Sequence, residues 1–70
     1  MRFETFLARV DRQHREQPTR RYGQILILEL SDVRPMLADN LRGGSKDPFH
    51  KQHKEECGEA IAFLSENYED

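Results

Sequence analysis

The sequence predicts an all-α fold: a small, compact bundle of three to four helices that forms one domain over residues 1–70. Apolar residues recur three and four positions apart along most of the chain, and this spacing lines one face of a helix. Prolines and a Gly-Gly pair divide the pattern at positions where helices usually begin or end. We expect the helices at about 3–15, 20–33, 35–42 and 48–67.

The first predicted helix has a single apolar face. Its apolar residues follow the i, i+3, i+4, i+7 spacing of an amphipathic helix and are Phe3, Phe6, Leu7 and Val10. Charged residues fall mostly on the opposite side. Pro18 closes the segment, because the residue before a proline is driven out of helical geometry.

The second predicted helix contains a continuous apolar run at residues 25–28, Ile-Leu-Ile-Leu. Such a run suits a buried strand as well as a buried helix. Two observations favour the helix. No second strand-like run is present for a strand to pair with, and Tyr22, Leu30 and Val33 continue a spacing of three to four residues around it.

The third predicted helix begins at Pro35, since the missing N–H of proline would be unpaired in the first turn of a helix. Its apolar positions are Met36, Leu37 and Leu41. The Gly-Gly pair at residues 43 and 44 ends it, and we expect one of these glycines to take the left-handed conformation.

The last predicted helix restarts at Asp47-Pro48, with Asp47 as its cap and Pro48 as its first residue. We expect Phe49 to be buried against the third helix. Gly58 lies inside the predicted helix and weakens it by about 1 kcal/mol relative to alanine. Close packing against another helix is therefore the predicted reason for Gly58.

Charge is unevenly distributed, although the net charge is only −2. Residues 1–21 carry +3, residues 22–54 carry +1 and residues 55–70 carry −6. Cys57 is the only cysteine, so no disulfide forms within one chain. A lone thiol without a secretory leader suits a reducing cytoplasm, where we expect the protein. No apolar run approaches the ~20 residues that span a bilayer, so we expect no membrane partner.

Four short blocks carry a resemblance to other proteins: Tyr22-Gly23-Gln24, Val33-Arg34-Pro35-x-Leu37-Ala38, Leu41-Arg42-Gly43 and Asp47-Pro48-Phe49-His50. In this order they resemble a group of small uncharacterised proteins of phages, prophages and plasmids. These proteins share an Arg-x-Gly-Gln, Val-Arg-Pro-x-Leu-Ala, Arg-Gly, Asp-Pro-Phe pattern. The resemblance implies a short, all-helical, cytoplasmic accessory factor. The chain departs from the group at residues 25–28 and at Gly44, where threonine is usual.

Two arginines lie within these blocks. We expect Arg34 and Arg42 to fix the turns by pairing with neighbouring aspartates, namely Asp32, Asp39 or Asp47.

The nearest approach to a metal site is His50, His53 and Cys57, whose spacing of three and four residues places them near one helix face. No paired ligand motif accompanies them, and Cys57 falls on the apolar stripe. We therefore predict a buried thiol, with no metal, no cofactor and no catalytic residue. A helical domain of this size has little room for a ~300 Å³ cleft, so we predict that the chain is not an enzyme.

Two sets of residues are candidates for binding. The first could contact an anionic partner and comprises Arg9, Arg12, Arg15, Arg20 and Arg21. Against nucleic-acid binding stand the net negative charge and a pI near 5.9. The second set comprises Ile25, Ile27, Leu28 and Leu30. These apolar residues spread around the second helix more widely than one apolar stripe requires, and an uncovered apolar patch predicts a homodimer through them.

The function predicted from the sequence is a non-enzymatic protein-interaction module. It would be a phage or mobile-element accessory factor that binds a host or phage protein, with inhibition as one form of that action. The alternative is a small nucleic-acid-binding regulator that uses the N-terminal arginines.

Overall fold

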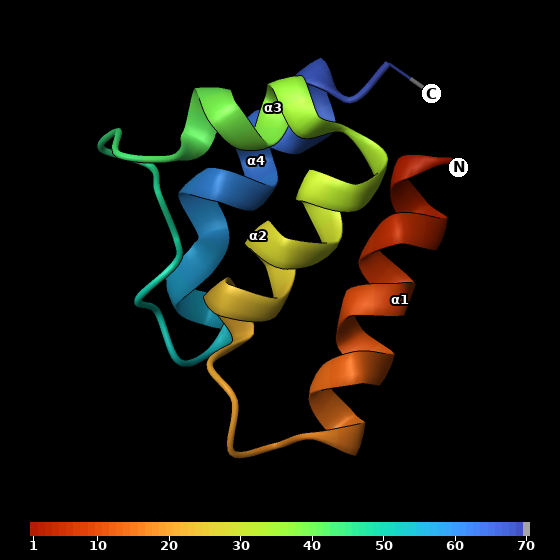
Figure 1. Ribbon diagram of the computed structural model, residues 1–70, viewed down its shortest axis with the longest axis vertical. Helices are drawn as coiled ribbons and strands as arrows, with labels where there is room; N and C mark the ends of the chain where they lie inside the picture. The colour runs from red at the N-terminus through yellow and green to blue at the C-terminus, as the bar shows by residue number, and fades with distance from the viewer. Residues whose placement is uncertain (70) are drawn as a thin grey trace.

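The computed structural model describes residues 1–69, which fold into helices joined by loops (Figure 1). The elements are α1 (Phe3–Glu16), α2 (Tyr22–Val33), α3 (Pro35–Leu41), the short 3-10 helix η1 (Lys54–Cys57) and α4 (Gly58–Asn67). These 69 residues contain no strand, and none of their helices is both long and apolar enough to cross a membrane. The predicted all-α bundle of three to four helices is confirmed. Asp70, the last residue of the acidic segment, lies outside the described residues.

α2 is the central helix. It lies between α1 and α4 in Figure 1, with α3 across one end, and it also contacts η1. This coverage explains why its sequence is apolar on nearly every side. The buried residues of α2 are Tyr22, Gly23, Ile25, Leu26, Ile27 and Leu30. Phe6 and Val10 of α1, Ala38 and Leu41 of α3, and Leu64 of α4 complete the core around it.

A single residue, Arg34, separates α2 from α3, and its non-helical backbone (φ −145°, ψ 71°) turns the chain between them. Pro35 is the first residue of α3, as predicted. At the other end of α3, Gly43 has φ +75°, so the expected left-handed glycine is found there. Glycine adopts this conformation at little cost, whereas other residues rarely do.

The predicted start of the last helix at Asp47-Pro48 is wrong. The Asp47 carboxylate instead holds a loop, because it accepts hydrogen bonds from the backbone N–H groups of Gly43 (2.7 Å) and Phe49 (2.9 Å). The chain then runs without helix to His53, and helical structure resumes only at η1. Aspartate before proline suits a turn as well as a helix start, and here the turn forms.

The loop before η1 stays non-helical because its carbonyls serve another helix. The N–H of Tyr22 donates to the carbonyl of Gln52 (3.1 Å), and the N–H of Gly23 donates to the carbonyl of Lys51 (3.0 Å). The first N–H groups of a helix have no partner within it, so an external acceptor is needed. Backbone carbonyls from residues 51 and 52 therefore take the place of a side-chain cap on α2.

This contact brings two backbones very close together. A Cβ atom at residue 23 would overlap the carbonyl oxygen of Pro48, so only glycine fits there. Pro48 is itself fully buried, whereas Phe49 is only partly buried and packs at the edge of the core. The expectation that Phe49 is the buried residue of this block is therefore wrong, and Pro48 takes that role.

The predicted close packing at Gly58 is also wrong. Gly58 is the first residue of α4, and a Cβ atom added there would meet nothing within 4 Å. The glycine that permits a close approach is Gly23, in the first turn of α2.

These two glycines give a matched pair of substitutions. Gly23→Ala should lower the free energy of unfolding by about 3 kcal/mol or more, because the new methyl group overlaps backbone that cannot move away independently. Gly58→Ala should leave stability unchanged or raise it by up to about 1 kcal/mol, since its backbone is already helical. Urea unfolding followed by circular dichroism measures both. Equal stability of the two variants would contradict the docking of the loop on α2.

Candidate functional site

Arg34 joins the corner between α2 and α3 to both ends of the chain. Its Nη1 donates to the carbonyl of Val33 (2.9 Å), and its Nη2 donates to the carbonyl of Met1 (3.4 Å). The guanidinium also lies 4.5 Å from the centre of the Tyr68 ring, a distance at which a cation is attracted to the ring face. Arg34 therefore fixes its turn through carbonyls and a ring, and the predicted pairing with an aspartate is not what the structure shows.

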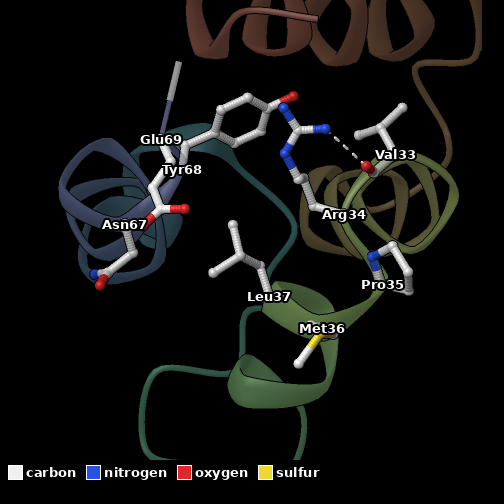
Figure 2. Close-up of a pocket in the computed structure, with 8 residues that line it drawn as sticks. All are labelled: Val33, Arg34, Pro35, Met36, Leu37, Asn67, Tyr68 and Glu69. Atoms are coloured by element: carbon white, nitrogen blue, oxygen red, sulfur yellow. Dashed lines mark hydrogen bonds between the residues drawn. The ribbon is translucent and has the colours of Figure 1, made fainter.

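Below Arg34 an open groove of about 640 Å³ runs between the start of α3 and the end of α4 (Figure 2). We call it the α3–α4 groove. Figure 2 shows the side chain of Leu37 extending towards the space between the two helices, with Tyr68 and Arg34 along one edge. The residues that line the groove are Val33, Arg34, Pro35, Met36, Leu37, Asn67, Tyr68 and Glu69. Most of this lining is apolar.

Met36 is the most exposed large apolar side chain of the described residues, at 81%. It was predicted at an apolar position of the third helix, and that prediction is wrong. The buried residues of α3 are Ala38 and Leu41, which face the core with the partly buried Leu37. Met36 lies on the opposite side of this one-sided helix, so the sequence spacing contained the signal for its exposure.

The predicted arginine face is divided by the structure. Arg9 is held by Glu29, with 2.7 Å between Nε and Oε1, so its charge is partly neutralised. Arg12 and Arg15 are exposed and line, together with Arg9, a hollow of about 590 Å³ along α1. The remaining two, Arg20 and Arg21, lie beyond the end of α1 and belong to a separate hollow.

That hollow, which we call the loop pocket, has a volume of about 330 Å³. Its lining comes from the end of α1, the loop before α2 and the loop before η1, and comprises His14, Pro18, Thr19, Arg20, Arg21, Gln52 and His53. Arg21 is anchored, because its Nε donates to the carbonyl of Phe49 (3.4 Å) and its guanidinium lies 5.8 Å from the centre of the Phe49 ring. The two histidines were not anticipated at an arginine site.

Three of the four residues expected at a dimer interface are core residues. Ile25 is 1% exposed, and Ile27 and Leu30 are fully buried. Leu28 alone is accessible, at 44%. The expectation that a 70-residue chain could not cover this helix is wrong, because α1, α3, η1 and the loop before η1 all pack around α2.

The residues of the weak metal pattern lie in different surroundings. His50 and His53 are exposed, whereas Cys57 is buried and its Sγ donates to the carbonyl of His53 (3.5 Å). Burial, with a smaller effect from Glu56, raises the pKa of the Cys57 thiol to about 11. Within residues 1–69 no group of three or more His, Cys, Asp or Glu residues is placed to hold a metal ion.

A hydrogen-bonded network joins α1, α2 and η1. The Tyr22 hydroxyl donates to Oδ1 of Asp11 (2.6 Å), and Nζ of Lys54 donates to Oδ2 of the same carboxylate (3.0 Å). Burial, then the hydrogen bond to Asp11, raises the pKa of Tyr22 above its ordinary value. This network therefore ties the start of α2 to both of its neighbours.

Both raised pKa values predict lower stability in alkali. The unfolded chain releases the Cys57 and Tyr22 protons at their ordinary pKa values, 9.0 and 10.0, while the folded chain keeps them to higher pH. The unfolded state then binds fewer protons, so the free energy of unfolding falls as the pH rises past 9. We expect a loss of about 2 kcal/mol between about pH 8 and pH 10.5 in urea unfolding, and a smaller loss in Cys57→Ala. An equal loss in that variant would contradict the assignment to Cys57.

The α3–α4 groove and the loop pocket are two of the concave surfaces that the described residues form, and the helix ends and loops that line them lie at opposite ends of the molecule (Figure 1). No family model matches this chain, and no curated protein or solved structure matches it.

Proposed function

We propose that this chain is a non-enzymatic protein-interaction module, an accessory factor of a phage or another mobile element that binds a host or phage protein. The observation that carries the proposal is the exposed Met36 beside the α3–α4 groove. Methionine is flexible and polarisable, and it is enriched where proteins bind one another. An apolar side chain of a partner would fill the groove while Met36 packs against the partner's surface.

The walls of the groove are held in place before any partner arrives. Arg34 bonds to the carbonyls of Val33 and Met1 and lies against the Tyr68 ring, so the start of α3 and the end of α4 are joined. A surface that is already ordered loses less conformational entropy on binding than a mobile one. This supports recognition of a folded partner, and inhibition of that partner is one form the interaction could take.

The state of the single thiol supports a non-enzymatic role. Cys57 is 1% exposed, and its pKa is raised to about 11. A thiol must be accessible and largely ionised to act as a nucleophile near neutral pH. Cys57 meets neither condition and is better described as part of the core.

A homodimer is a further part of the proposal, in a form different from the one expected from sequence. Only Leu28 remains as an apolar contact on the outer side of α2. One leucine supplies a small part of the ~800 Å² that each partner usually buries in a stable interface. The dimer we propose is therefore weak and centred on Leu28.

A small nucleic-acid-binding regulator is the second candidate. The specific observation in its favour is that Arg12 and Arg15 are both exposed on α1, where they could contact phosphates. Two findings weigh against it. The basic surface is reduced by the pairing of Arg9 with Glu29, and the chain carries a net charge of −2.

The groove proposal predicts that Met36→Glu abolishes partner binding. We expect tagged wild-type protein to capture a partner from bacterial host lysate, and Met36→Glu to lose it, because a carboxylate would be desolvated in the apolar contact. Asn40→Glu is the matched control, since Asn40 is exposed on the same helix but does not line the groove. Capture that survives Met36→Glu, or is lost equally in the control, would contradict the groove as the binding surface.

Neighbouring residues of α2 test the dimer and the core together. Ile27→Glu should unfold the protein, because it places a charge in the core. Leu28→Glu should stay folded by circular dichroism and should be monomeric. Sedimentation of the wild type at about 100 μM should show a monomer–dimer equilibrium, as expected for a Kd of that order. A wild type that stays monomeric there removes the dimer from the proposal.

A further inference from the structure

The loop pocket is lined by hydrogen-bond donors and contains no acidic side chain. Of its seven lining residues, six carry a side chain that can donate a hydrogen bond, and Pro18 is the exception. Two of the six are arginines, whose planar guanidinium groups match the oxygens of phosphate. The hollow along α1 also lacks acidic lining residues, but Arg9 there is paired with Glu29. The loop pocket favours an anion with several acceptor oxygens.

We propose that the loop pocket binds the phosphate group of a small molecule, a phosphomonoester such as a nucleoside monophosphate, with Arg20 and Arg21 as its main contacts. Arg21 bonds to the Phe49 carbonyl through Nε, which leaves its two terminal nitrogens for a ligand. Arg20 gives only Nη1 to the side chain of Gln17 (3.1 Å), an exposed contact that a ligand can replace. His14 and His53 stand at the sides of the pocket as further donors.

The histidines are held by the fold. The His14 ring meets the Tyr22 ring edge-on, with 5.4 Å between centroids. The backbone N–H groups of Gln52 and His53 both donate to Oε1 of Glu56, at 3.1 and 3.0 Å, which fixes the loop that carries them. The hydrogen bond from the His53 N–H is the largest cause of the lowered pKa of the Glu56 carboxyl. Glu56 is therefore occupied by the loop and is not directed at the ligand.

The surroundings favour a single phosphate over a nucleic-acid backbone. Asp11 and Glu55 line the hollow next to the loop pocket together with Arg15 and Lys54, so its charge is mixed, and Glu16 lies at the end of α1. A polyanion that extends past the pocket would meet these carboxylates, whereas a small phosphomonoester stays within about 330 Å³ of donor-lined space. Arg15 lines this neighbouring hollow and Arg12 lies outside it, so the surface beyond the loop pocket mixes acidic and basic side chains and is not a uniformly basic track.

The test is a chemical-shift titration of the full ¹⁵N-labelled chain with inorganic phosphate and with AMP, against sodium chloride at the same ionic strength. We expect saturable shifts at the residues lining the loop pocket, with AMP at least as tight as phosphate and a Kd of about 1 mM or below. Arg20→Gln should raise the Kd about tenfold, as expected for loss of a charge-assisted contact. Arg12→Gln is the matched control, because it removes the same charge from α1 outside the pocket.

The outcomes distinguish a phosphate site in the loop pocket from diffuse attraction of anions and from nucleic-acid binding. Shifts that chloride reproduces, or an Arg12→Gln effect as large as that of Arg20→Gln, would mean diffuse charge and would overturn it. Duplex DNA that binds at equal ionic strength more tightly than AMP, and is weakened by Arg12→Gln, would assign the arginines to nucleic acid and also overturn it. Circular dichroism of Arg20→Gln confirms that any loss is not unfolding. None of these readouts depends on the α3–α4 groove.

Discussion

The backbone N–H groups in the first turn of α2 have no acceptor carbonyl within α2, because helical hydrogen bonds run to the carbonyl four residues earlier. In this chain the carbonyls of Lys51 and Gln52 accept two of them. The approach is possible only because Gly23 has no side chain to strike the carbonyl of Pro48. The loop before η1 is therefore held against the central helix, and η1, which leads directly into α4, begins where that loop ends. This contact therefore fixes the position of the chain just before η1 relative to the start of α2.

The four short sequence blocks at residues 22–24, 33–38, 41–43 and 47–50 take part in contacts that hold the fold together. Gly23, with Arg21 before it, lies against Pro48 and Phe49. The second block forms the corner at Arg34, which lies over the ring of Tyr68. Most residues of these blocks therefore serve the fold. Met36 occupies the position that the pattern leaves open, and its side chain is 81% exposed.

Much of the helical architecture follows from local sequence signals. The structure differs from the prediction where contacts with a distant segment of the chain determine the local conformation. The apolar spacing of α1 and the proline at the start of α3 are local signals, and both predicted elements form. Asp47 before Pro48 carries the same chemistry for a helix cap as for a turn, and only the demand of α2 for carbonyls selects the turn. The dimer interface predicted at Ile25, Ile27, Leu28 and Leu30 is mostly core, since spacing alone does not reveal how many segments surround a helix. For the site, the arginines of the loop pocket were anticipated, whereas His14 and His53 were not, because they reach it from different parts of the chain.

Arg21 and Arg34 flank the two ends of α2, and their side chains are held by similar contacts. Each lies over an aromatic ring, at 5.8 Å from Phe49 and 4.5 Å from Tyr68, and each donates to a backbone carbonyl. Their positive charge therefore acts first within the fold, as does that of Arg9 through Glu29. A count of arginines in the sequence therefore overstates the charge available to a long polyanion. The same anchoring places a fixed guanidinium beside each concave surface, so the α3–α4 groove and the loop pocket are shaped before a ligand arrives.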